Sequence, residues 1–188
     1  MATKKSEYIM PAVVLMLICA IISGLLAVVY NLTYVDNTGV LTEKLLDGCK
    51  DIFGEGEYQM IVDIDADEKK IPLTFDGVTS VILDEKGNCL FEIYARGYEK
   101  DGIHFLIGFD NAGAVKGISI VDISETPGLG TKVNNSAYLS NFTDMADKDA
   151  PLSVDNITGA SRSSMGLKNA VSKAIETFKT NKEVIFSE

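Results

Sequence analysis

An uncharged, apolar segment near the N-terminus constrains this chain most strongly. Residues 8–35 carry no charged side chain, and residues 12–29 are almost entirely aliphatic or small. About 20 apolar residues cross a bilayer as a helix, whereas a signal peptide has a shorter apolar core of about 7–15 residues. There is no convincing small-x-small cleavage site, and Cys19 lacks the small preceding residue of a lipoprotein signal. We therefore predict a transmembrane anchor over residues 1–35 and a separate domain over residues 36–188.

The residues that flank this segment predict its orientation. Lys4 and Lys5 precede it, and positive charge beside a span favours the cytoplasmic side. Tyr8 and Tyr30 stand near its two ends, where interfacial aromatic side chains are common. We expect a single-pass protein whose remaining residues lie on the periplasmic or extracellular side.

Charge and cysteine usage exclude several classes of function. The net charge of -10 argues against nucleic-acid binding, which favours basic patches. There is no Cys-x-x-Cys pair, and His104 is the only histidine, so we expect no zinc or iron–sulfur site. We expect His104 to be structural rather than catalytic. A disulfide between Cys49 and Cys89 is allowed but not indicated, and free buried thiols are the favoured alternative.

The middle of the chain has the pattern of an antiparallel β-meander. Alternating β-rich segments are joined by short turns that contain Gly, Asp or Asn, residues that tolerate the backbone angles of tight turns. The four expected strands are residues 78–84, 89–98, 103–109 and 114–123, and residues 59–64 suggest another.

Helical segments surround this meander in the sequence. Residues 42–53 have the spacing of an amphipathic helix with Thr42 as its N-cap, and residues 137–142 predict a short helix. Residues 163–178 place Leu167, Val171 and Phe178 on one face, which we expect to pack on the sheet. The predicted fold class is α+β: a transmembrane helix, then an antiparallel meander packed by helices.

Two loops stand out as candidate binding elements. The first follows the last strand, and its sequence is Glu125-Thr126-Pro127-Gly128-Leu129-Gly130. Pro-Gly is ordinary turn chemistry, so a plain strand-ending turn is one interpretation. The alternative is a cofactor loop, because two glycines let the main chain lie against a flat ring and bond its polar edge.

The second loop leads into the last helix. It runs from Asp155 to Ser164 and includes the sequence Thr158-Gly159-Ala160-Ser161-Arg162. The first amides of a helix lack intrahelical partners and suit a phosphate, which Arg162 would also attract. Gly159 and Ala160 would let the backbone approach closely. The simpler interpretation is a Ser/Thr N-cap without a ligand.

Together these two loops resemble the motifs of the RnfG/NqrC family of FMN-binding subunits. Asp-x-x-Thr-Gly-Ala-Ser, residues 155–161, is similar to that family's flavinylation motif, which usually ends in Thr. The resemblance implies FMN attached through its phosphate to the hydroxyl of Ser161 by a flavin transferase that uses FAD. It also implies that residues 158–162 and the loop Glu125–Gly130 bind the cofactor. No independent catalytic site and no metal are expected.

The same resemblance implies a place in a larger assembly. The expected protein is an electron-carrying subunit of an Rnf-type ferredoxin:NAD oxidoreductase in the bacterial cell membrane, coupled to Na⁺ or H⁺ translocation. Its partners would be other Rnf-type membrane subunits, including a second flavin-carrying integral subunit. The alternatives are an FMN-binding domain of an Nqr-type NADH:quinone system or of extracellular electron transfer, and an extracytoplasmic module without flavin.

Overall fold

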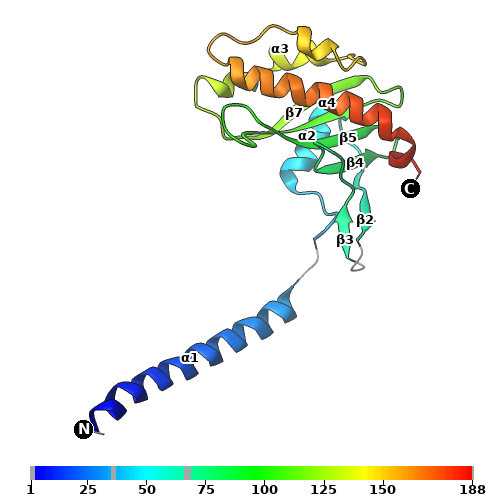
Figure 1. Ribbon diagram of the computed structural model, residues 1–188. Coiled ribbons are helices and arrows are strands. Elements are labelled where there is room, and N and C mark those ends of the chain that lie inside the picture. Colours follow the sequence, from blue (N-terminus) through cyan, green and yellow to red (C-terminus); the bar gives the residue numbers. More distant parts are fainter. Residues whose placement is uncertain (1–2, 35–36, 66–68, 188) are drawn as a thin grey trace. The chain divides into compact units, whose positions relative to one another are not determined.

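The computed structural model describes residues 3–34, 37–65 and 69–187. The chain divides into two compact units, residues 1–37 and 38–188. The predicted boundary between Val35 and Asp36 lies outside the described residues. Figure 1 shows both units, which are considered separately below.

The first unit consists of the helix α1 (Thr3–Thr33). Its segment Met10–Thr33 is long and apolar enough to cross a membrane. At a rise of about 1.5 Å per residue this segment is about 36 Å long, which exceeds the roughly 30 Å of bilayer hydrocarbon. The helix therefore fits a single-pass membrane protein, as expected. The side chains of Lys4, Lys5 and Tyr8, on which the predicted orientation rests, lie outside the described part.

The second unit is built on a five-stranded antiparallel sheet with the strand order β1-β4-β5-β6-β7. The predicted four-stranded meander is present, and β1 adds a fifth strand beside β4. The strands are β1 (Tyr58–Met60), β4 (Ser80–Asp84), β5 (Cys89–Ala95), β6 (Ile103–Phe109) and β7 (Val115–Ile123).

The strand expected over residues 59–64 is in fact two strands. After β1 the chain leaves the main sheet, and β2 (Val62–Ile64) pairs with β3 (Lys70–Pro72) in a separate two-stranded sheet. Ile61, between β1 and β2, stays buried in the core of the domain. The local sequence does not reveal this change of partner, because both pieces have the same β-rich composition.

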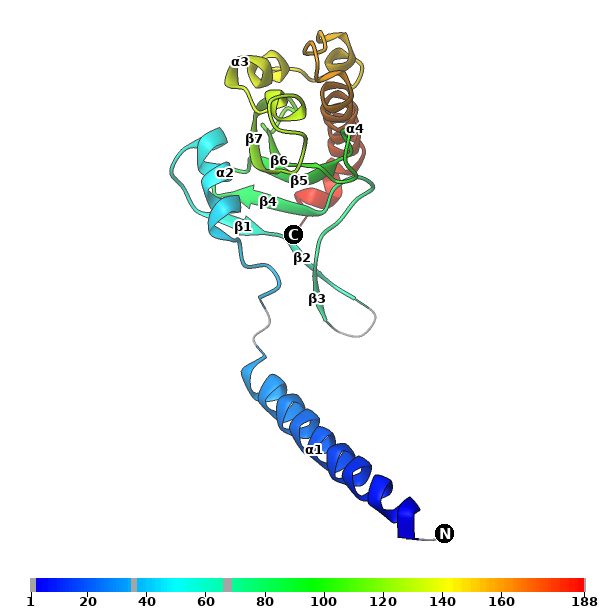
Figure 2. The same ribbon diagram turned by 90° about the vertical axis from the view of Figure 1, so that its left-hand side faces the viewer.

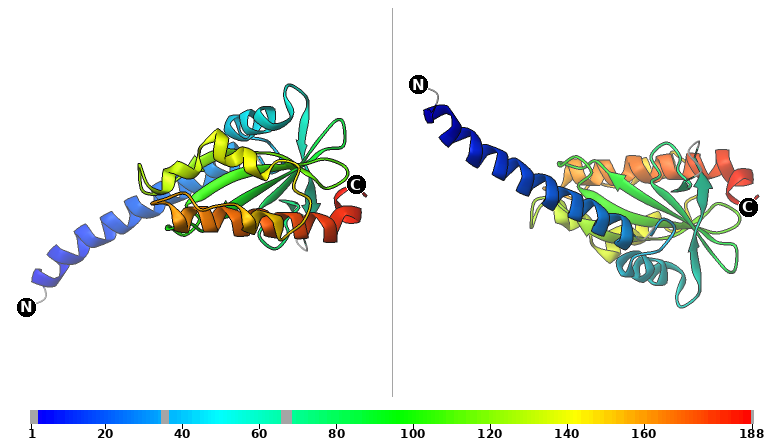
Figure 3. Two further views of the ribbon diagram at one scale, coloured as in Figure 1. Left: turned by 90° about the horizontal axis from the view of Figure 1, so that it is seen from above. Right: turned by 90° about the horizontal axis from the view of Figure 1, so that it is seen from below.

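Two helices cover opposite faces of the sheet (Figures 2 and 3). α2 (Glu43–Phe53) lies across one face, with Thr42 accepting the capping hydrogen bond from the Leu45 amide as predicted. α4 (Ser161–Ile185) lies along the other. The remaining helical pieces are η1 (Gly130–Val133), α3 (Ser136–Leu139), η2 (Ser140–Phe142) and η3 (Ala150–Ser153).

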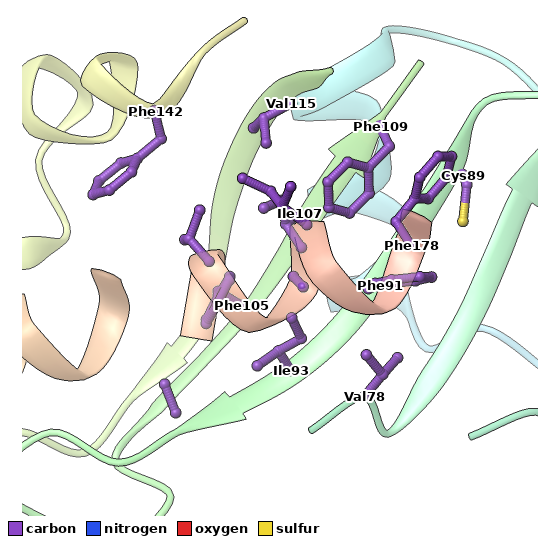
Figure 4. Packing of buried hydrophobic residues seen from close by; sticks show 14 of the residues in the cluster. Val78, Cys89, Phe91, Ile93, Phe105, Ile107, Phe109, Val115, Phe142 and Phe178 are labelled. Carbon is purple, nitrogen blue, oxygen red and sulfur yellow. The ribbon is translucent and has the colours of Figure 1, made fainter. Parts of the chain in front are cut away.

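Alternation along β5 assigns its side chains to two cores. Phe91 and Ile93 belong to the cluster under α4, whereas Leu90 belongs to the cluster under α2. Phe178 of α4 stacks on Phe109 with ring centroids 4.8 Å apart (Figure 4). Each such buried ring contributes about 1.5–3 kcal/mol, so this contact holds α4 firmly on the sheet. The α+β prediction is confirmed.

Both cysteines of the sheet domain are free and buried. Cys89 belongs to the cluster under α4, and Cys49 belongs to the cluster under α2. The two thiols therefore lie on opposite faces of the sheet, which explains why they do not form a disulfide.

Candidate functional site

The hydroxyl of Ser161 stands at the first residue of α4, two residues earlier than the predicted helix start. The N-cap is Ala160, which has no side chain that accepts a hydrogen bond, and the first turn contains no acidic residue. None of the motif's hydroxyl groups therefore caps the helix, contrary to the simpler interpretation. Ser161 is exposed, and no protein hydrogen bond engages its hydroxyl among the described residues. Its oxygen is free for chemistry.

A tight turn over residues 157–160 precedes Ser161. The Ala160 amide donates to the Ile157 carbonyl at 2.9 Å, and Gly159 between them has a φ of +81°. Only glycine adopts such an angle without strain, which explains the glycine of the motif. The Ile157 amide also donates to Ser164 Oγ at 3.1 Å, so the turn is fastened to the first turn of α4.

The other motif, Glu125–Gly130, forms a turn of the same kind. The Leu129 amide donates to the Thr126 carbonyl at 3.1 Å, and Gly128 has a φ of +72°. The Gly128 amide donates to Thr131 Oγ1 at 2.9 Å, which ties the turn to η1. The predicted Pro-Gly turn is confirmed, with Pro127 at the position where proline favours turns.

Glu125 connects the two motifs from inside the protein. Its carboxylate is only 4% exposed and accepts hydrogen bonds from the Tyr98 and Glu99 amides, both at 3.1 Å. It also accepts one from Ser163 Oγ at 2.6 Å. The strand β5 therefore ends at Ala95 rather than at Tyr98, since the following amides turn inward to this carboxylate.

Three glycines make room for the Glu125 carboxylate. A Cβ atom at Gly97 would lie 2.5 Å from Oε1, and one at Gly130 would lie 2.6 Å from Oε2. A Cβ atom at Gly102 would also overlap Oε1. The second glycine of the first motif is therefore required for close packing, whereas Gly128 is required for its backbone angle.

The two motifs meet around one cavity of about 520 Å³. Its lining combines residues of both with the segment after β5: Tyr98, Glu125, Thr126, Leu129, Gly130, Gly159, Ala160, Ser161, Arg162 and Ser163. Pro127, Gly128 and Thr158 were also predicted as site residues, but they are not among the lining residues. Thr158 instead offers its carbonyl to Lys132 Nζ at 3.5 Å.

Sequence reasoning missed Tyr98 and Ser163, which belong to neither predicted set. Tyr98 is 61% exposed, and the Cζ of Arg162 lies 5.6 Å from the centroid of its ring, a cation–π distance. Only the fold brings Tyr98 to the loop, so no local signal marks it. Ser163 stands two residues after the motif that ends at Ser161, and its role depends on Glu125, 38 residues earlier.

The cavity has the properties that a flavin mononucleotide requires. Its volume lies within the roughly 300–1,000 Å³ typical of small-molecule sites. Leu129 and Tyr98 present exposed apolar surface for a flat ring, and the turn at Thr126 offers peptide groups for the polar edge of that ring. The carboxylate of Glu125 is already engaged by three donors. The residues present therefore fit this cofactor.

A second cavity, of about 320 Å³, adjoins the first at Ser161 and Arg162. Its other lining residues are Arg96, Gly97, Met165, Gly166 and Asn169. Ser161 and Arg162 thus border both cavities.

His104 lines neither of these cavities, and its side chain contacts other residues of the sheet. Its Nε2 is 2.8 Å from Glu92 Oε1, and Ser80 Oγ donates to Glu92 Oε2 at 2.5 Å. The His104 ring stacks on Tyr94 with centroids 4.0 Å apart. Burial raises the pKa of Glu92, but the hydrogen bonds from His104 and Ser80 outweigh it, so the pKa lies below its ordinary value.

Comparisons with known proteins agree with this site. Residues 97–176 match the family model of the FMN-binding domain, a range that contains both motifs. The chain is also similar to a protein of Methanosarcina acetivorans, the G component of an ion-translocating oxidoreductase complex. The two are 25% identical over 175 residues, which cover 87% of this chain and 90% of that protein. These matches confirm the resemblance to the RnfG/NqrC family that the two motifs indicated.

Proposed function

We propose that this chain is the FMN-carrying subunit of a membrane-bound, ion-translocating oxidoreductase complex of the Rnf type, with FMN esterified to Ser161. The observation that carries the proposal is the convergence of two motifs, 25 residues apart in the chain, on one cavity beside a free serine hydroxyl. The family match over residues 97–176 and the similarity to the Methanosarcina acetivorans protein support the same function.

Ser161 supplies the oxygen for attachment. In the proposed maturation step its Oγ forms a bond to the flavin-side phosphorus of FAD, the bond from that phosphorus to the AMP phosphate breaks, and AMP leaves. The hydroxyl proton passes to a base of the flavin transferase. Serine provides the same nucleophilic oxygen as the threonine usual in the family. Because the hydroxyl stands at the start of a packed helix, it is held in place rather than carried on a mobile loop.

FMN, when bound, accepts two electrons together and releases them singly, which suits a relay between two-electron and one-electron partners. The chain's own residues bind and orient it. Leu129 and Tyr98 would flank the ring, the peptide groups of the turn at Thr126 would bond its polar edge, and the first amides of α4 would bind the phosphate. A covalent link prevents loss of the cofactor on a side of the membrane without a flavin pool.

The proposed setting follows from the anchor. Residues 1–35 would hold the protein in the bacterial cell membrane, and residues 36–188 would form the flavin domain on the periplasmic or extracellular side. The orientation rests on Lys4 and Lys5. The partners would be the other Rnf-type membrane subunits, among them a second flavin-carrying integral subunit, with electrons passing between ferredoxin and NAD.

Intact-mass measurement on protein made together with a flavin transferase tests the proposal. We expect the added mass of one FMN, mapped to the peptide that contains Ser161. Ser161→Ala should abolish the added mass, and Ser161→Thr should retain it because the oxygen stays in place. Thr180→Val removes an exposed hydroxyl from the far part of α4 and should leave the added mass unchanged. Flavin that persists on the Ser161→Ala protein after denaturation would refute this attachment site.

A further inference from the structure

Arginine has an unusual distribution in this chain. Among 188 residues only Arg96 and Arg162 are arginines, and both line the cavity of about 320 Å³ that adjoins Ser161. They come from different elements, since Arg96 follows β5 and Arg162 is the second residue of α4. A chain with a net charge of -10 thus has both of its arginines in the lining of one cavity.

Close packing between backbone segments brings the main chain at Arg96 against the helix that carries Arg162. Gly166 stands one turn after Arg162, on the same face of α4. A Cβ atom at Gly166 would overlap the carbonyl oxygen of Arg96 and lie 2.8 Å from its carbonyl carbon. The main chain at Arg96 therefore lies directly against the helix face that carries Arg162. The Cζ of Arg162 also lies 5.6 Å from the centroid of the Tyr98 ring.

Nothing in this cavity neutralises the two positive charges. The remaining lining residues are Gly97, Ser161, Met165, Gly166 and Asn169, none of which is acidic. Within the described ranges no ion pair involves either arginine, whereas lysines such as Lys116 and Lys173 pair with carboxylates. Two like charges that face one cavity repel each other unless an anion lies between them.

We propose that Arg96 and Arg162 form a phosphate clamp beside Ser161. The clamp holds the phosphate group of the ester at Ser161, which leaves the larger cavity to the flavin ring. This inference rests on the proposed attachment for its purpose. Each guanidinium offers five N–H donors in a planar fork that matches phosphate oxygens, a geometry that lysine does not provide. The clamp adds Arg96, which neither motif contains, to the cofactor site.

Arg96 is the residue that distinguishes this arrangement from a simple helix-start site. Arg162 borders both cavities, so its loss would affect any ligand in either. Arg96 borders only the smaller cavity. A substitution at Arg96 should therefore weaken phosphate binding while it leaves the surroundings of the ring unchanged.

The first experiment uses the full chain in detergent, made without a flavin transferase so that Ser161 is unmodified. Titration with inorganic phosphate, followed by ³¹P NMR, should show saturable binding. Arg96→Gln should weaken it at least about tenfold, as expected for the loss of charge-assisted hydrogen bonds, and Arg96→Lys should weaken it less. Lys179→Gln removes one exposed charge from the far part of α4 and should change nothing. Wild-type binding by Arg96→Gln, or none by the unsubstituted chain, would overturn the clamp.

The second experiment uses the flavin-loaded chain and separates the clamp from the proposed function. The ³¹P resonance of the phosphodiester should move in Arg96→Gln and stay in place in Lys179→Gln. An unmoved resonance, with FMN mapped to Ser161, would remove the clamp but keep the attachment. Phosphate binding that depends on Arg96, without any flavin at Ser161 after exposure to the transferase, would keep the anion site and refute the attachment.

Discussion

The contact between Gly166 and the main chain at Arg96 makes Gly166→Ala a decisive perturbation. In the interior of an exposed helix, replacing glycine with alanine stabilises a protein by up to about 1 kcal/mol, because alanine has the higher helix propensity. Gly166 has ordinary helical geometry within α4, so propensity alone predicts stabilisation. The new methyl group would overlap the Arg96 carbonyl and lie 3.1 Å from Gly97 Cα.

The steric term outweighs the propensity term at this position. The atoms that the methyl group meets are backbone atoms, which cannot rotate away like the end of a side chain. The residues on either side are also fixed, since the Tyr98 and Glu99 amides bond the buried Glu125 carboxylate. Overpacking in such a place costs about 1–3 kcal/mol or more. Because the overlap is with backbone atoms, the upper part of that range, about 2–3 kcal/mol, applies. Subtracting the propensity gain of about 1 kcal/mol leaves a net loss of roughly 1–2 kcal/mol in the free energy of unfolding.

Urea unfolding of the full chain in detergent, followed by tyrosine fluorescence, measures this change. Gly48→Ala in α2 is the matched control, because its methyl group would lie 2.9 Å from Leu106 Cδ1, the movable end of a side chain. We expect a small change for Gly48→Ala and a lower midpoint for Gly166→Ala. The displaced start of α4 should also slow FMN attachment at Ser161. A Gly166→Ala midpoint equal to or above that of the unsubstituted chain would refute this account of the contact.

Three further predictions follow from the buried polar groups. Glu125→Ala leaves two amides and one hydroxyl without their acceptor, so we expect a loss of about 2–4 kcal/mol in unfolding free energy by urea titration. Burial, reinforced by the charge of Glu92, raises the pKa of Cys49 to about 12, and burial also raises the pKa of Cys89. Iodoacetamide reacts with the thiolate, so it should label both thiols roughly a hundredfold or more slowly in native protein than in urea, with mass spectrometry as the measurement. Because the folded pKa of Glu92 is lowered, its stabilising contribution is complete above the ordinary carboxyl pKa of about 4.3 and is lost as the pH falls through the folded value. Glu92→Gln should therefore flatten the fall in stability below about pH 4, and an unchanged slope would assign that fall to other carboxylates.

The parts of the fold that were predictable have local signals. Period-two alternation and glycine-bearing turns locate β4 to β7, and the helical spacing after residue 163 locates most of α4. The pairing of β1 with β4 has no such signal, because no short turn joins the two strands. The sequence also did not predict the extension of α4 to Ile185. Ile185 is buried, and the ring centroids of Phe186 and Phe178 lie 6.2 Å apart.

Only the part of the site that belongs to the two motifs was predictable from the sequence. Glycine, proline and hydroxyl residues at fixed spacing mark both turns, and the structure brings them to one cavity. Tyr98 and Arg96 join the site through long-range contacts, Tyr98 by donating to Glu125 and Arg96 by packing on Gly166. Such contacts depend on the assembled sheet and helix, so no window of sequence reveals them.

The hydrogen bond between Ser163 and Glu125 explains how two separate motifs act as one site. Glu125 is the first residue of the motif Glu125–Gly130, and Ser163 stands two residues beyond Ser161, where the other motif ends. The same carboxylate holds the segment after β5, which in turn packs against Gly166 of α4. The Ser161 hydroxyl, the loop at Thr126 and both arginines are therefore positioned by one rigid set of contacts before any cofactor arrives. Because the site is ordered before the cofactor binds, binding does not have to order its loops. We therefore expect changes at the buried Glu125 to affect attachment at Ser161, although Glu125 belongs to the other motif.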